Sequence, residues 1–166
     1  MQRLFQSLSR AALLVSALFL AAAPATAQRL GAGAGSFLSA DQQVHVFACS
    51  ISQWPNGDVH GFALVLEPAT QGLVLVNCTS AMQFGNSLGV AGNVVLSLNA
   101  PPFLQVGSPT FFFLQDNGSA GPDAFAGLGG VPPQLGNLTI QQIVALIGTP
   151  PPSALAPLLT GNIRVW

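Results

Sequence analysis

Short strand-like runs and turn residues alternate along the chain, and this spacing limits the folds that it can adopt. The clearest example is Asn56-Gly57, between two runs rich in β-branched and aromatic residues. Asn and Gly tolerate the positive φ of a tight hairpin turn. Turn residues recur roughly every 8–12 positions, which predicts an all-β antiparallel sandwich or small barrel of about 7–9 strands. The predicted strands are Val44–Ser52, Val59–Glu67, Leu73–Cys78, Ala81–Phe84, Val90–Leu98, Thr110–Gln115, Ala124–Leu128 and Asn162–Trp166.

One segment near the C-terminus has helical periodicity instead. Thr139 is a suitable N-cap for a short helix over Ile140–Ile147, and Gly148 is a suitable stop. We expect this helix to pack over one open end of the sheet, with a partner-binding helix as the alternative. Its apolar face, spaced i, i+3, i+4, i+7, consists of Ile140, Ile143, Val144 and Ile147.

The first 27 residues have the three regions of an export signal. Arg3 and Arg10 give a positive start, Ala11–Ala23 is apolar, and Ala25-Thr26-Ala27 supplies the small residues of a cleavage site. A membrane-spanning helix needs roughly 20 apolar residues, more than this run contains. We therefore predict a signal peptide over 1–27 and a secreted, periplasmic or extracellular location. The alternative is an N-terminal membrane anchor.

The remaining 139 residues are predicted to form one domain. Residues 28–42 are small and glycine-rich, which predicts a flexible leader. Their glycines lack the spacing of a dinucleotide-binding loop. Residues 43–166 then form a single β domain with a Pro- and Leu-rich insertion at 129–160.

Charge excludes two classes of partner. After signal removal, the chain contains two arginines and five carboxylates, which give a net charge of −3, and it has no lysine. Nucleic-acid binding and attachment to anionic lipid both need clustered basic residues. We expect no nucleic-acid partner and no transmembrane segment after cleavage. A protein or cell-surface partner is compatible with a surface of so few charges.

Two patterns resemble catalytic or metal sites. Gly85-Asn86-Ser87-Leu88-Gly89 matches the G-x-S-x-G nucleophile motif, but a strand-like run follows where that motif needs a helix. His45 and His60 fall too far apart along the predicted hairpin to share one ion. No carboxylate accompanies either histidine at acid–base spacing. We predict no catalytic residue and no cofactor.

The segment from Asp116 to Asp123 is the best candidate for a metal site. Asp116, Asn117 and Asp123 offer carboxylate and amide oxygens, the ligands that calcium prefers. Their spacing does not fit an EF-hand, and a simple turn accounts for Asp-Asn-Gly. We expect a structural turn, with calcium as the alternative. For a surface turn, Asp123→Asn changes stability by no more than about 0.5 kcal/mol.

Four segments together resemble a family of small exported bacterial β domains, the post-COAP-like secreted domains. They are Asn56–Gly61, Gly89–Val95, Phe113–Gly118 with Asp123, and Gly161–Val165. The resemblance covers roughly residues 43–128 and the last strand, and it implies fold and compartment without an activity.

Cys49 and Cys78 are the only cysteines. An oxidising compartment favours pairing. In a meander, however, the strand 59–67 separates them, with Cα atoms about 9–10 Å apart, beyond the reach of a disulfide. We favour two buried thiols over a bridge.

These observations favour an exported non-catalytic domain with a structural, adhesive or surface-interaction role. A secreted hydrolase with an unrecognised site is the alternative. A concave site bordered by several polar residues would favour the hydrolase.

We predict that the exported protein begins at Gln28, because the small residues before it satisfy signal peptidase. Intact-mass spectrometry of protein from an exporting host measures this. Full-length chain in the membrane fraction would instead indicate that Ala11–Ala23 is an anchor.

Overall fold

The computed structural model describes residues 27–40, 42–132, 138–150 and 154–166. The predicted signal peptide therefore lies outside the described residues, except for Ala27. The elements are β1 (Gln28–Leu38), β2 (Val44–Gln53), β3 (Val59–Glu67), β4 (Gly72–Phe84), β5 (Ser87–Leu98), the 3₁₀ turn η1 (Pro102–Leu104), β6 (Pro109–Gln115), β7 (Ala124–Gly130), α2 (Ile140–Ile147) and β8 (Ala156–Val165).

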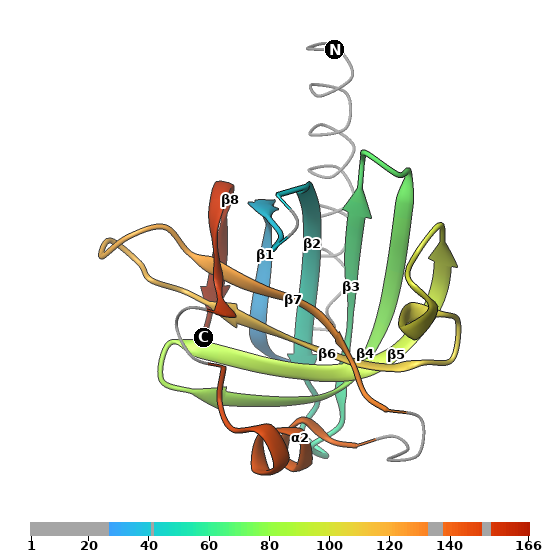
Figure 1. The fold of residues 1–166 in the computed structure, drawn as a ribbon. Coiled ribbons are helices and arrows are strands. Elements are labelled where there is room, and N and C mark those ends of the chain that lie inside the picture. Colours follow the sequence, from blue (N-terminus) through green and yellow to red (C-terminus); the bar gives the residue numbers. More distant parts are fainter. Residues whose placement is uncertain (1–26, 41, 133–137, 151–153) are drawn as a thin grey trace.

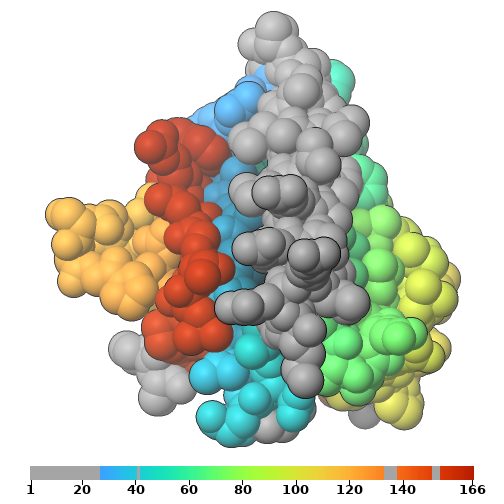
Figure 2. Space-filling model, turned by 90° about the horizontal axis from the view of Figure 1, so that it is seen from above, coloured from blue at the N-terminus to red at the C-terminus, as the bar shows by residue number. Residues whose placement is uncertain are grey.

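The strands of the described residues form one closed antiparallel barrel in the order β1 to β8. Each strand pairs with the next along the chain, and β8 pairs with β1 from Gly31↔Val165 to Phe37↔Leu158. The last strand accordingly lies against the first (Figures 1 and 2). The predicted all-β class, with a small barrel as one of its two forms, is confirmed.

Most strand positions agree closely with the prediction, but β8 begins at Ala156, earlier than the predicted Asn162. The predicted strands Leu73–Cys78 and Ala81–Phe84 are one strand, β4, which continues through an irregularity between Cys78 and Ser80. A bulge bends a strand without ending it.

The predicted flexible leader was wrong, because residues 28–38 form β1 and close the barrel. Gly31 and Gly33 are needed where large side chains of other strands come close to β1. A Cβ on Gly31 would lie 2.5 Å from Leu88 Cδ2, and one on Gly33 would lie 2.8 Å from Ile163 Cγ1. Glycine at these positions leaves space for large neighbouring side chains and does not make the segment flexible.

The C-terminal helix is confirmed with its predicted ends. Thr139 accepts a hydrogen bond from the Gln142 amide in a capping box, and Gly148 follows the last turn. The expected position over an open end was wrong, since Ile140 and Ile143 pack with Ala91 and Phe113 in a cluster separate from the barrel core. Ile147, predicted on the packed face, is 62% exposed. The insertion predicted at 129–160 contains α2 and the start of β8.

Both cysteines are free and lie in the barrel core. The predicted intervening strand is confirmed, because β3 lies between β2 and β4. Burial raises the pKa of Cys49 to about 12, against a smaller lowering by a hydrogen bond from the Gly33 backbone. Burial also raises the pKa of Cys78, with a further contribution from Cys49. The thiols are therefore protonated and unreactive at neutral pH.

We predict that a thiol reagent at pH 8 labels neither cysteine in the folded protein and both after unreduced denaturation. The reason is that burial keeps both thiols protonated and inaccessible. Absorbance of the released reagent gives the count. Zero thiols in denaturant would demonstrate a Cys49–Cys78 disulfide and contradict the strand order.

Candidate functional site

The two ends of the barrel are filled differently. At the end where β1 turns into β2 and β3 into β4, the interior contains a cavity of about 240 Å³. Deeper in the barrel, Phe47, Phe112 and Phe125 are fully buried and stack on one another, with centroids of Phe47 and Phe125 4.5 Å apart. These three rings belong to the packed part of the barrel core.

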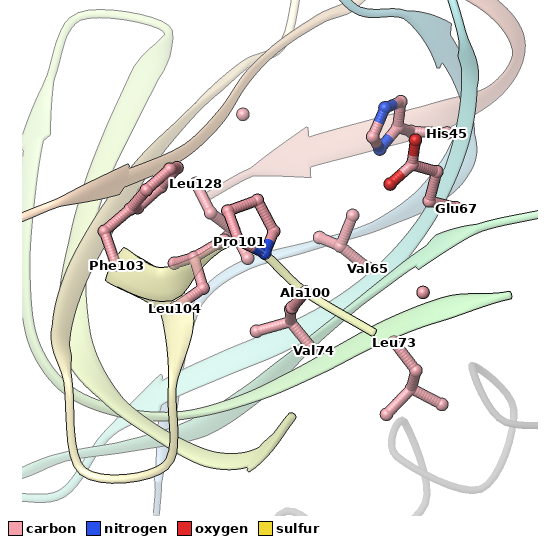
Figure 3. A pocket seen from close by; sticks show the side chains of 12 residues that line it. His45, Val65, Glu67, Leu73, Val74, Ala100, Pro101, Phe103, Leu104 and Leu128 are labelled. Carbon is pink, nitrogen blue, oxygen red and sulfur yellow. The ribbon is translucent and has the colours of Figure 1, made fainter. Parts of the chain in front are cut away.

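The cavity walls are apolar except for one imidazole and one carboxylate, from His45 and Glu67. Figure 3 shows these two side chains next to one another, with Phe103, Leu104 and Leu128 across the cavity from them. In the part of the chain that the structure describes, no lysine, arginine, serine, threonine or cysteine lines the cavity. The apolar lining includes Val65, Leu73, Val74, Ala100, Pro101, Phe103, Leu104 and Leu128.

Strand register explains why His45 and Glu67 meet. Alternate residues of β2 face inward, so His45 points to the same side as the buried Phe47, Cys49 and Ile51. The β2–β3 ladder ends at Val46↔Leu66, and His45 and Glu67 are the next residues beyond that pair. The imidazole also stacks on Phe37 of β1, at a centroid distance of 5.4 Å. The sequence prediction missed this pair, although the β2 alternation already indicated an inward His45.

His45 presents an unsatisfied polar atom at this site. Its Nε2 is buried and has no hydrogen-bond partner among the described residues. Ser97 Oγ is in the same condition, and Ser97 pairs with the cavity residue Val74. Buried polar atoms in folded proteins nearly always have a partner, and those that lack one require an explanation. Both such atoms lie at the open end of this barrel.

The β5–β6 connection covers part of the cavity mouth. It contains η1, and the Leu104 amide donates to the Pro101 carbonyl at 2.9 Å. The Gln105 side-chain amide donates to the carbonyls of Ala100 and Pro101. Phe103 packs over Gly130, where a Cβ would lie 2.9 Å from Phe103 Cδ2. These bonds hold the connection in one conformation over the mouth.

The Asp116–Asp123 segment lies at the opposite end and joins three parts of the barrel. Asp123 is buried, and its Oδ1 and Oδ2 accept the amides of Asn117 at 2.9 Å and Ile163 at 2.6 Å. Asp116 accepts the amides of Gly118 and Val165. The expected turn is present. Its carboxylates also accept backbone amides of β8, and the local spacing of residues did not indicate these hydrogen bonds.

This arrangement leaves few oxygen ligands for a cation. All four carboxylate oxygens of Asp116 and Asp123 accept backbone amides, and the side-chain amide of Asn117 donates to the Pro122 carbonyl. Among the described residues, no group of three or more His, Cys, Asp or Glu is placed to hold a metal ion. Calcium would compete with the amides that join this segment to β8.

The other two candidates are also placed by the structure. Ser87 begins β5 directly after the β4–β5 turn, so a strand follows the G-x-S-x-G match, as expected. His60 pairs with Ser52 on the outer face of the sheet, while His45 faces inward. The two imidazoles therefore lie on opposite faces.

Comparisons of the chain with protein-family models, curated proteins and solved structures found no match. Within the described ranges, no helix has the length and apolar character to cross a membrane.

We predict that Asp123→Asn lowers the free energy of unfolding by about 1–3 kcal/mol, because the amide nitrogen of Asn cannot accept the backbone hydrogen bond that it replaces. This revises the small effect expected for a surface turn. Urea denaturation measures the change.

The matched control is Asp58→Asn in the exposed β2–β3 turn, where the carboxylate accepts a hydrogen bond from the side-chain amide of Asn56. Its effect should stay within about 0.5 kcal/mol. Equal effects of the two substitutions would contradict the role given to Asp123. A calcium-dependent rise in melting temperature that Asp123→Asn removes would demonstrate a metal site instead.

Proposed function

We propose that the chain is an exported, non-catalytic domain that binds one small apolar molecule in the open end of its barrel. The observation that carries the proposal is the apolar cavity of about 240 Å³ at one end of the barrel. Export rests on the N-terminal sequence. The small volume of the site narrows the expected surface-interaction role toward a small ligand rather than a macromolecule.

The barrel suits such a ligand physically. Eight strands enclose an interior just wide enough for side chains or for one small molecule. The walls belong to continuous hydrogen-bonded ladders, so little conformational entropy is lost when a ligand enters. A dry apolar cavity of about 150 Å³ is enough to bind benzene. The larger cavity here therefore suits a skeleton of about two fused rings.

A binding role is favoured over hydrolysis by the composition of the cavity wall. Nucleophilic catalysis needs a hydroxyl or thiol within hydrogen-bond reach of a base. Among the described residues, the cavity lining includes the base His45 but no serine, threonine or cysteine. Ser87 of the G-x-S-x-G match is the first residue of β5, at the other end of the barrel.

Ala100→Phe tests the site by placing a ring in the cavity mouth, where Ala100 is a partly buried lining residue. We expect naphthalene to bind the wild-type chain and its affinity to fall at least about tenfold in the variant. Isothermal titration calorimetry measures the affinity, and circular dichroism verifies that the fold is retained.

The control is Ala120→Phe, which introduces the same ring in the exposed β6–β7 connection. This variant should bind naphthalene like the wild type. Binding that survives Ala100→Phe, or a wild-type chain that binds no naphthalene, would refute the proposed function.

A further inference from the structure

Exposed apolar side chains gather at the cavity end of the barrel. Six large ones lie on the last residue of β1, the final part of β5 and the β5–β6 connection: Leu38, Val95, Leu96, Leu98, Phe103 and Val106. The others in the described residues are spread over the β2–β3 turn, β3, α2, β8 and the end of the chain. A group of exposed apolar side chains on a folded domain marks a surface for a partner or a membrane.

The charged side chains have the opposite distribution. Five described ones belong to the start of β1, the β2–β3 turn, the β6–β7 connection and the end of β8, all at the far end: Arg29, Asp58, Asp116, Asp123 and Arg164. At the cavity end, Glu67 is the only charged residue that the structure describes. Asp41, between β1 and β2, lies outside the described residues. The segment 68–115, which contains β4, β5 and β6, has no charged residue. One end of the barrel is therefore apolar and the other is charged.

The β5–β6 connection holds two of the apolar side chains in solvent. The Gly107 amide donates to the Val94 carbonyl at 2.8 Å, and the Val94 amide donates to the Ser108 carbonyl at 3.0 Å. These hydrogen bonds fix the backbone next to Val106, which is 64% exposed. Phe103 lines the cavity (Figure 3), yet 53% of this residue remains exposed. The backbone of the connection is thus held where both side chains face solvent.

We propose that the cavity end of the barrel docks on the surface of a net-neutral lipid bilayer, with Leu98, Phe103 and Val106 inserted between the lipid headgroups. Burial of apolar side chains at the interface favours this docking, while the charged far end stays in water. The inference goes beyond the proposed function. Docking places the mouth of the cavity against the lipid, so that an apolar molecule passes between bilayer and cavity without crossing water.

The charges at this end decide which lipid surface it fits. Anionic headgroups attract clustered lysine and arginine, and the described part of the cavity end contains neither. The Glu67 carboxylate would be repelled by such headgroups. A phosphatidylcholine bilayer has no net charge, so the apolar side chains determine binding. A second copy of the chain would need a continuous complementary face, whereas fluid lipid surrounds side chains that project separately.

Val106→Asp tests the docking surface, because it places a charge on the most exposed of these side chains. The exported protein should co-sediment with phosphatidylcholine vesicles, and its partition coefficient should fall at least about fivefold in the variant. Replacing part of the lipid by phosphatidylglycerol should not strengthen binding. All variants share one N-terminus, so the N-terminal segment contributes equally to each.

The matched control is Leu146→Asp. Leu146 is also 64% exposed, but it belongs to α2, which contacts Ser80 and Ala81 of β4 away from the cavity end. This variant should bind vesicles like the wild type. Circular dichroism verifies that both variants keep the fold.

Val106→Trp reports directly on insertion. The native tryptophans, Trp54 between β2 and β3 and Trp166 after β8, lie at the far end. Phosphatidylcholine vesicles should therefore leave the emission wavelength of the wild type unchanged. The emission of Val106→Trp should shift to shorter wavelength, because the added ring enters the bilayer.

The outcomes separate this inference from the proposed function. Val106 is not among the described residues that line the cavity, so Val106→Asp should still bind naphthalene without vesicles. Absence of vesicle binding, equal binding of wild type and Val106→Asp, or binding that requires phosphatidylglycerol would overturn the docking inference. A wild-type dimer in light scattering that Val106→Asp separates would assign the surface to a second copy instead. Vesicle binding by a chain that binds no naphthalene would overturn the proposed function alone.

Discussion

Closure of the barrel depends on the seam between β7 and β8. Only Ala124↔Pro157 and Phe125↔Ala156 pair across this seam, whereas β8 pairs with β1 over most of its length. The Asp123 carboxylate adds a hydrogen bond across this short ladder, since it accepts the backbone amide of Ile163 in β8. The Asp123 carbonyl also accepts the Leu158 amide. A charged acceptor makes a stronger hydrogen bond than a neutral one, so one side chain stabilises an otherwise weakly paired junction.

The same closure divides the interior into a packed part and a hollow part. Glycines on the inward face of β1 allow Leu88 and Ile163 to approach the strand closely and fill the barrel around its middle. Toward the other end, Phe37 replaces glycine on that inward face, stacks on His45 and packs at a tilt against Phe125. The aromatic side chains fill this part of the core. The cavity lies at the same end and is lined by residues of β2, β3, β4, β7 and the β5–β6 connection.

Local chemistry made much of the fold predictable. The Asn56-Gly57 turn, the Thr139 N-cap and the bounds of β3 depend on residues close in sequence, and all three were predicted. The strand β1 was missed because its glycines and alanines have low strand propensity. Its two-residue alternation of Gly and Ala was nevertheless a strand signal. Two features could not be predicted from spacing along the chain, because they depend on strand register and barrel closure. They are the proximity of His45 and Glu67 and the hydrogen bond between Asp123 and Ile163.

The two ends of the barrel also differ in whether their polar groups have hydrogen-bond partners. At the β8 junction, every carboxylate oxygen of Asp116 and Asp123 accepts a backbone amide, so these residues are committed to the fold. At the cavity end, His45 Nε2 is buried without a hydrogen-bond partner among the described residues, which costs free energy. An imidazole in that place therefore contributes less to stability than an apolar side chain of similar size would.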